Sequence, residues 1–136
     1  MKIDGACQCG AIKIEGDADP EKVSVCHCTD CQVGTGTAFR VTIPVPGATL
    51  KMTGQPTLFL KTTAESGRPR VQAFCPKCGS PIYSTTPGDG VQPSYMVRVG
   101  ILRQRDQLPP KRQIWWRSAR PWVTGLDAVP KVEKQT

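Results

Sequence analysis

This 136-residue chain lacks the composition that builds a large apolar core. Only 38% of its residues are apolar and 6% aromatic, while glycine and proline contribute 13 positions each. No apolar run approaches the roughly 20 residues of a membrane-spanning helix, and the first residues lack the apolar segment of a secretory signal. We therefore expect a cytoplasmic protein with one domain over residues 1–136, a core from about residue 3 to 124 and a frayed tail from about residue 129.

The sequence also lacks helical periodicity, because proline or glycine interrupts every stretch that could keep a 3.6-residue apolar repeat for ten residues. Short segments rich in β-forming residues are present instead, bounded by turn residues. The expected strands cover residues 11–15, 23–25, 39–43, 57–62, 70–74, 82–85, 95–99 and 113–117. Residues 34–37 are expected to form a flexible loop, and Pro44 and Pro46 to end the third strand. This pattern predicts an all-β sandwich or small open barrel with very little helix.

Cysteine is abundant where histidine is scarce: the chain has seven cysteines and one histidine. A cytoplasmic chain keeps its thiols reduced, and an odd number does not close a disulfide framework, so metal binding is the better interpretation. The cysteines fall into a central triplet and two flanking pairs. The triplet is Cys26, Cys28 and Cys31, and the pairs are Cys7 with Cys9 and Cys75 with Cys78.

The two pairs together supply the four thiolates of a closed, structural zinc site. Cys7 and Cys9 face the same way in an extended segment, and Cys75 to Cys78 has the spacing of a zinc knuckle, with Gly79 suited to a left-handed conformation. The pairing is inferred, because the triplet could borrow a ligand from either pair.

The triplet could form a second structural site with His27 as its fourth ligand. In an extended segment, however, the ring of His27 points away from the sulfur atoms of Cys26 and Cys28. We therefore favour three thiolates and an exchangeable fourth ligand. Asp30 is interpreted as a turn residue between Cys28 and Cys31 rather than as a ligand.

Four motifs in fixed order resemble the glutathione-dependent formaldehyde-activating enzyme (GFA) family, which also includes centromere protein V. They are residues 5–10 around Cys7 and Cys9, Cys26-His27-Cys28-x-x-Cys31-Gln32, Phe74-Cys75-x-x-Cys78-Gly79-Ser80, and residues 114–122 from Ile114 to Trp122. The resemblance implies an Mss4-like fold stapled by zinc. It also implies a structural Zn²⁺ on Cys7, Cys9, Cys75 and Cys78 and an active-site Zn²⁺ on Cys26, Cys28 and Cys31.

The activity that the resemblance implies is a carbon–sulfur lyase reaction, in which a small thiol such as glutathione combines with formaldehyde or a related aldehyde. A three-thiolate zinc suits this chemistry, because it can bind a substrate thiol and lower its pKa. The carboxylates of such a thiol need cationic partners, for which Arg98, Arg117 and Arg120 are candidates. The Arg103-Gln104-Arg105 segment departs from the family pattern and could serve a different acidic thiol.

Charge suggests a second interpretation. The formal net charge is +7, which seven thiolates on two Zn²⁺ would lower to about +4. From Arg98 onward, nine Lys and Arg residues face three acidic ones. The alternative is therefore a zinc-stabilised binding module for nucleic acid or another polyanion, without catalytic activity. A family member whose second site is empty or inert is a third possibility, and the sequence leaves the oligomeric state open.

Overall fold

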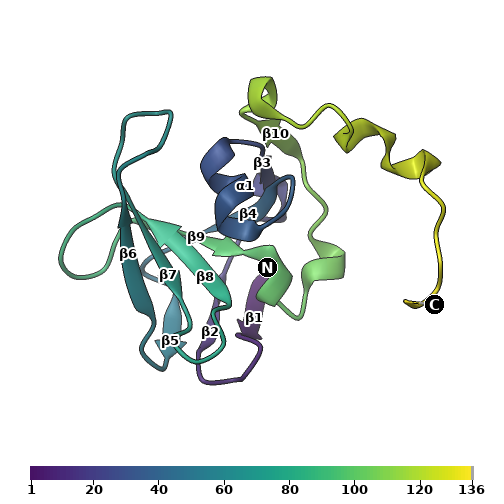
Figure 1. The fold of residues 1–136 in the computed structure, drawn as a ribbon. Helices are drawn as coiled ribbons and strands as arrows, with labels where there is room; N and C mark the ends of the chain where they lie inside the picture. Colours follow the sequence, from purple (N-terminus) through teal and green to yellow (C-terminus); the bar gives the residue numbers. More distant parts are fainter. Residues whose placement is uncertain (136) are drawn as a thin grey trace.

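The computed structural model describes residues 1–135, which form two β-sheets and one α-helix (Figure 1). The smaller sheet is antiparallel with strand order β1-β2-β5. Its strands are β1 (Lys2–Ala6), β2 (Lys13–Asp17) and β5 (Lys51–Thr53). This sheet brings the start of the chain beside the segment that follows β4.

The larger sheet has seven strands in the order β10-β3-β4-β9-β8-β7-β6. Its members are β3 (Ser24–Cys26), β4 (Arg40–Pro46), β6 (Thr57–Lys61), β7 (Arg70–Phe74), β8 (Pro81–Thr85), β9 (Ser94–Arg98) and β10 (Arg112–Ile114). All neighbours are antiparallel except β10 and β3, which run parallel. The all-β class with very little helix that was expected from the sequence is confirmed.

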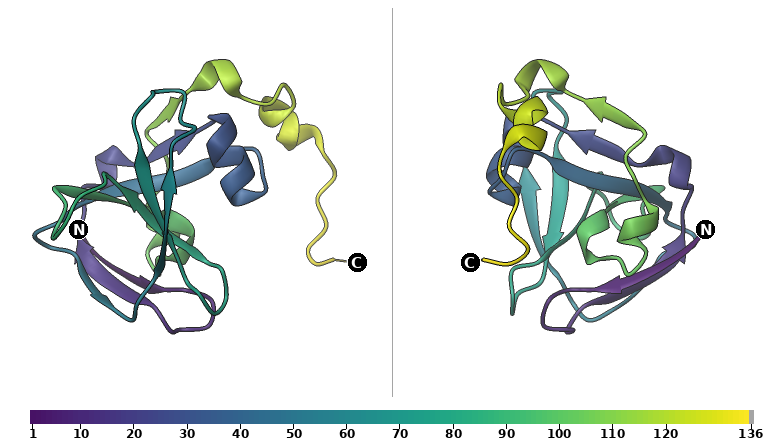
Figure 2. Two further views of the ribbon diagram at one scale, coloured as in Figure 1. Left: turned by 60° about the vertical axis from the view of Figure 1, so that its left-hand side comes forward. Right: turned by 90° about the vertical axis from the view of Figure 1, so that its right-hand side faces the viewer.

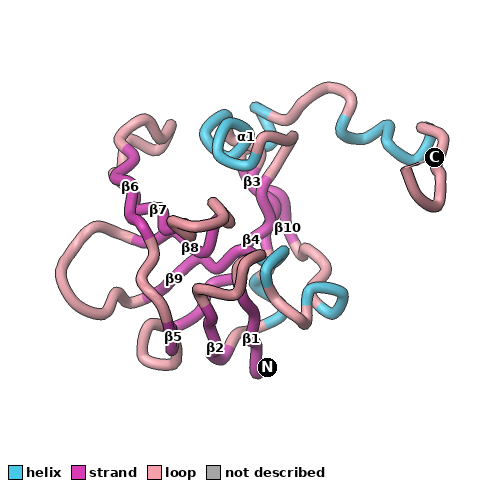
Figure 3. Tube along the Cα trace, turned by 60° about the horizontal axis from the view of Figure 1, so that its bottom comes forward, coloured by secondary structure: helices cyan, strands magenta, loops and turns pink. Residues whose placement is uncertain are grey.

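Helical structure in residues 1–135 is limited to α1 and five short 3₁₀ turns, which Figure 3 shows as cyan segments. The α-helix is α1 (Thr29–Thr35). The 3₁₀ turns are η1 (Pro20–Lys22), η2 (Val99–Ile101), η3 (Arg105–Gln107), η4 (Trp116–Ser118) and η5 (Val123–Ala128). None of the described helices is long and apolar enough to cross a membrane.

One hydrophobic cluster joins the two sheets. Ile3 and Ile14 of the small sheet belong to the same buried cluster as Ile43, Ile82 and Val97 of the large sheet, and each is no more than 3% exposed. Burial of such side chains contributes about 1.5–3 kcal/mol each. The small sheet therefore covers one face of the large sheet with apolar side chains.

The register of the large sheet separates an apolar face from a polar one, because residues paired across strands point to the same side. Val97 of β9 pairs with Ile43 of β4 and Tyr83 of β8, and these side chains face the core. The next positions along the strands face the opposite side. They include Cys26 paired with Arg40, Thr42 paired with Arg98, and Ser84 paired with Met96. The polar face carries the residues of the candidate site described below.

Two expectations about local structure were wrong. Residues 34–37 do not form a loop throughout, because α1 continues to Thr35 and ends at Gly36, which has φ +70°. The strand predicted at 39–43 continues through Pro44 to Pro46. It can do so because β3 pairs only with residues 40–42, so the rest of β4 is free on that side and needs no amide donor there.

The sequence patterns also missed β1 and β5 and placed the last strand too far along the chain. Strand β1 contains Gly5 and has only one fully buried side chain, Ile3, and β5 has only three residues. The strand predicted at 113–117 spans Arg112–Ile114, because Trp115 adopts a left-handed conformation with φ +54° and η4 follows. This turn changes the direction of the chain at the end of β10.

The chain beyond η4 leaves the body as an arm, which Figure 2 shows extending away from both sheets. Apolar side chains on the arm are largely exposed, including Trp122, which precedes η5, and Leu126 within η5. Residues 129–135 lie outside any helix or strand and are exposed.

Candidate metal centres

The four paired cysteines meet at one end of the body. The sulfur atoms of Cys7, Cys9, Cys75 and Cys78 all lie within 4.8 Å of one another. Cys9 Sγ is 3.7 Å from both Cys7 Sγ and Cys75 Sγ. Four bonds of about 2.3 Å in a tetrahedral arrangement separate sulfur atoms by about 3.8 Å, so these distances fit zinc.

Local hydrogen bonds to the sulfur atoms of this cluster favour the thiolate form. The amide of Ile12 donates to Cys7 Sγ at 3.2 Å, and Ser80 Oγ lies 3.2 Å from Cys78 Sγ. The hydrogen bonds from the side chain and amide of Ser80 lower the pKa of Cys78 to about 5. Gly79 has φ +76°, as expected for the turn, and its amide donates to the carbonyl of Cys75. The turn thus directs two sulfur atoms to one point.

The triplet forms a second cluster where β3 leads into α1. Cys26 ends β3, Cys28 is the N-cap of α1 and Cys31 lies in its first turn. The three sulfur atoms lie within 4.8 Å of one another. The amide of Cys31 donates to Cys28 Sγ at 3.3 Å, so the sulfur of Cys28 caps the helix.

The electrostatics of the triplet favour negative charge on Cys31. Its hydrogen bond with Cys26, followed by the charge of Arg40, lowers the pKa of Cys31 to about 5. The same hydrogen bond, followed by burial, raises the pKa of Cys26, and burial raises the pKa of Cys28. Of the three thiols, Cys31 therefore loses its proton first, while Cys26 and Cys28 keep theirs to higher pH.

His27 lies outside this cluster, in agreement with the expectation that its ring points away. The ring is fully buried, and its Nε2 donates to Gln113 Oε1 at 2.7 Å. It also makes edge contacts with Phe39 and Trp116. Asp30 is likewise not part of the cluster, but it lies in the first turn of α1 rather than in a simple turn.

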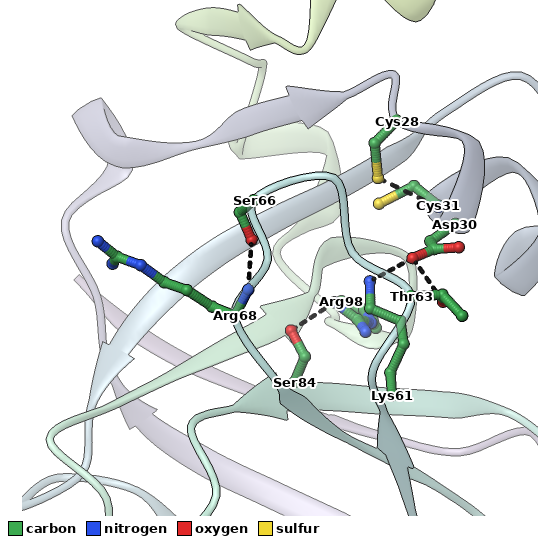
Figure 4. Close-up of polar contacts among 9 residues, drawn as sticks. All are labelled: Cys28, Asp30, Cys31, Lys61, Thr63, Ser66, Arg68, Ser84 and Arg98. Carbon is green, nitrogen blue, oxygen red and sulfur yellow. Dashed lines mark hydrogen bonds and ion pairs between the residues drawn. The ribbon is translucent and has the colours of Figure 1, made fainter.

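The triplet opens onto a cavity of about 310 Å³ on the polar face of the large sheet. Its lining includes four cations, which are Arg40, Lys61, Arg70 and Arg98, and one acid, Glu65. In Figure 4, Lys61 reaches Asp30, and Arg98 extends toward Ser84 below Cys31. The cavity thus joins sulfur ligands to a cationic wall.

Two of these cations, Arg40 and Arg98, are buried. Arg98 is 6% exposed and donates from Nη1 to Ser84 Oγ at 3.3 Å. Burial, followed by the like charge of Arg40, lowers the pKa of Arg98 to about 9. Arg40 is 5% exposed. The sequence interpretation missed Arg40, Lys61 and Arg70, because only the pairing of β3 with β4 and of β6 with β7 brings them toward the triplet.

The other two predicted anchors lie differently from Arg98. Arg117 forms an ion pair with Glu65 at 3.0 Å and stacks over Trp115, both of which line the cavity. Arg120 is exposed and donates to the carbonyl of Ser118, outside the cavity lining. A substrate contact of either residue stays a prediction.

The basic C-terminal segment does not act as one unit. Arg98 is buried, Arg103 pairs with Asp4, and Lys111 pairs with Glu21 at 3.5 Å. The segment containing Arg103 and Gln104 binds β1 through Asp4 and lies away from the cysteine triplet. These positions give the polyanion-binding alternative no specific support.

The family model described as glutathione-dependent formaldehyde-activating enzyme matches residues 2–118. The chain belongs to this family. Both cysteine clusters of this GFA-family protein lie within the matched range and could bind a metal, consistent with zinc.

The fold has a relative of known structure. A solved protein from Rhodobacter sphaeroides, a structural genomics target, is 22% identical to the chain and superimposes with a TM-score of 0.58. The match covers 81% of this chain and 98% of the other. No match to the sequence is found among curated proteins. The likeness to the solved structure supports the fold of the GFA-family chain.

Proposed function

We propose that this protein is a zinc-dependent carbon–sulfur lyase that forms or cleaves the adduct of a small, glutathione-like thiol with formaldehyde or a related aldehyde. The observation that carries the proposal is the cluster of three sulfur atoms opening onto a cation-lined cavity. Family membership supports the same reaction class.

The donor set supports zinc at both clusters. Cys7, Cys9, Cys75 and Cys78 would saturate a tetrahedral ion, whereas Cys26, Cys28 and Cys31 would leave one position for a ligand from outside the chain. Zinc held by the three cysteines would supply a Lewis acid that favours the thiolate form of a substrate thiol. His27 is not placed to take the remaining position, because it does not belong to the cluster of ligand atoms that the three cysteines form.

The residues of the chain contribute charge and position. Arg40 and Arg98 line the cavity beside the triplet, so they would favour an anionic sulfur over a neutral one. Loop residues 64–66 and Trp115 border the same cavity and would hold the thiol and the aldehyde together. The protein thereby converts an encounter of two molecules in solution into a reaction between positioned groups.

The reaction balances without an oxidant or reductant. The substrate sulfur forms a bond to the aldehyde carbon, and the carbonyl π electrons move onto oxygen. The oxygen takes up one proton, which replaces the proton that the thiol releases. The cleavage direction reverses these changes, so one arrangement of residues serves both.

Thiol binding can be tested with protein in which cobalt replaces zinc. Addition of glutathione should change the sulfur-to-cobalt absorption, and mixing zinc-loaded protein with glutathione and formaldehyde should speed adduct formation seen by NMR. Cys26→Ser should lose both responses, whereas Arg105→Gln, an exposed residue of η3, should keep them. An unchanged spectrum with glutathione and with other small thiols would rule out the proposal.

A further inference from the structure

We infer that Arg40 and Arg98 form a carboxylate-binding site in the floor of the cavity, so the substrate thiol carries a carboxylate near its sulfur. The inference rests on the proposed function in taking the ligand to be a thiol, but the carboxylate site can be tested by itself. According to this inference, two buried arginines recognise the substrate, rather than exposed residues at the edge of the cavity.

Strand register places the two arginines beside the sulfur cluster. Cys26 of β3 pairs directly with Arg40 of β4, so their backbones are about 5 Å apart and their side chains share a face. Thr42, two residues further along β4, pairs with Arg98 of β9 on that face. A ligand with its sulfur at the cysteines can thus reach both guanidinium groups within one small cavity.

Both guanidinium groups have unused hydrogen-bonding capacity. The Nε atoms of Arg40 and Arg98 are buried and lack a hydrogen-bond partner among residues 1–135. No ion pair within the described chain involves either residue. Leaving a charged donor buried and unpaired is costly, and a carboxylate is the anion whose geometry matches a guanidinium. The unpaired Nε atoms therefore point to a ligand.

The charges near Arg40 and Arg98 do not neutralise the positive charge of these two arginines. Lys61 is paired with Asp30 at 3.4 Å, and Glu65 is paired with Arg117. Three thiolates on one Zn²⁺ would carry a charge of about −1, which balances only one of the two arginines. Arg70 also lines the cavity and forms no ion pair among the described residues. About two positive charges therefore remain around the cavity, enough to balance a carboxylate.

Helix α1 leaves space for one of the arginines. A Cβ atom on Gly34 would lie 2.3 Å from Nη2 of Arg40, so the guanidinium would have to move to make room for any other side chain. The glycine therefore lets the guanidinium of Arg40 pack against the helix that also carries Cys31. The site is built from the same element as the sulfur cluster, so the carboxylate and sulfur positions are fixed relative to each other.

The inference predicts a preference that can be measured in unmodified protein. With cobalt-loaded protein, 3-mercaptopropionate should bind at least about tenfold more tightly than its methyl ester, which has the same thiol and chain but no charge. In zinc-loaded, ¹⁵N-labelled protein, acetate alone should shift the NMR signals of the Nε–H groups of Arg40 and Arg98. Arg98→Lys and Arg40→Lys would assign these signals and should reduce the preference, while Arg105→Gln should not.

The outcomes separate the two proposals. Equal binding of the acid and its ester, with unmoved arginine signals, would overturn the carboxylate site and leave the thiol reaction standing. Arginine signals that move with acetate while no thiol changes the cobalt spectrum would support the site and overturn the thiol reaction. If both experiments show no response, both proposals fail. The comparison of 3-mercaptopropionate with its methyl ester uses unmodified protein, so a variant that fails to fold does not prevent the decision.

Discussion

The imidazole of His27 is bound to Gln113, with 2.7 Å between Nε2 and Oε1. Gln113 belongs to β10 and His27 directly follows β3, its parallel neighbour, and the amide of His27 also donates to the carbonyl of Ile114. A residue from the last strand therefore binds the single histidine on the side of its Nε2 atom. The ring lies outside the sulfur cluster, which leaves the triplet with three protein ligands.

Replacing His27 with alanine should lower stability without lowering metal content. The side chain is fully buried, and its loss leaves a cavity and removes the hydrogen bond with Gln113, so we expect a cost of about 2–4 kcal/mol. Chemical denaturation would measure the cost, and elemental analysis would count zinc per chain. A loss of one zinc in folded protein would instead make His27 a ligand.

The two cysteine clusters should differ in their effect on folding. Cys78→Ala removes a ligand from the cluster that joins the first hairpin to the turn after β7, and a structural zinc contributes about 10–16 kcal/mol in small domains. We expect this variant to be unfolded or strongly destabilised in circular dichroism. Cys26→Ala should keep the fold and lose one zinc. Similar melting temperatures for the two variants would contradict the division of roles.

Gly34→Ala should separate ligand binding from stability. Alanine is favoured over glycine in a helix by about 1 kcal/mol, but its Cβ would push the guanidinium of Arg40 aside. We expect several-fold weaker binding of 3-mercaptopropionate with little change in the binding of its methyl ester. Gly125→Ala in η5, where the added Cβ meets no atom within 4 Å, is the matched control. Equal weakening for acid and ester would show that Arg40 does not bind the carboxylate.

Acid stability should depend on Asp4 and on the segment from Arg103 to Gln104. The hydrogen bonds from Arg103 and then Gln104 lower the pKa of Asp4 below its usual value of 3.8. Because the folded-state pKa is the lower one, the stabilisation is present above the unfolded-state pKa and is lost as pH falls through the folded-state value. Asp4→Asn should therefore flatten the fall in stability below about pH 4.

Unfolding by urea at several pH values would measure this effect. Thiol selectivity should be unchanged in Asp4→Asn, since Asp4 is absent from the cavity lining. A change in selectivity would instead connect the segment around Arg103 to substrate choice, as its departure from the family pattern had suggested.

The cysteines that could bind metal could be inferred from their spacing in the sequence, whereas the residues that surround the cysteine triplet could not. The Cys75–Cys78 turn and its left-handed Gly79 depend on adjacent residues, and so does the alternation that turns His27 away from Cys26. Helix α1 was missed because glycine and β-branched residues weaken its intrinsic propensity. The cap formed by Cys28 and contacts with Lys61 and Thr63 at Asp30 support it instead.

The sequence by itself determined the all-β class, the family and the separation of seven cysteines into four and three, because these follow from short-range patterns and motif order. Only the tertiary structure decided which cations surround the triplet. Arg40, Lys61, Arg70 and Arg98 come from four different strands or strand ends, and β-sheet register brings them to one face. Register depends on pairing between distant segments, so neither the net charge nor the basic C-terminal segment could reveal that two buried arginines lie beside the cysteines.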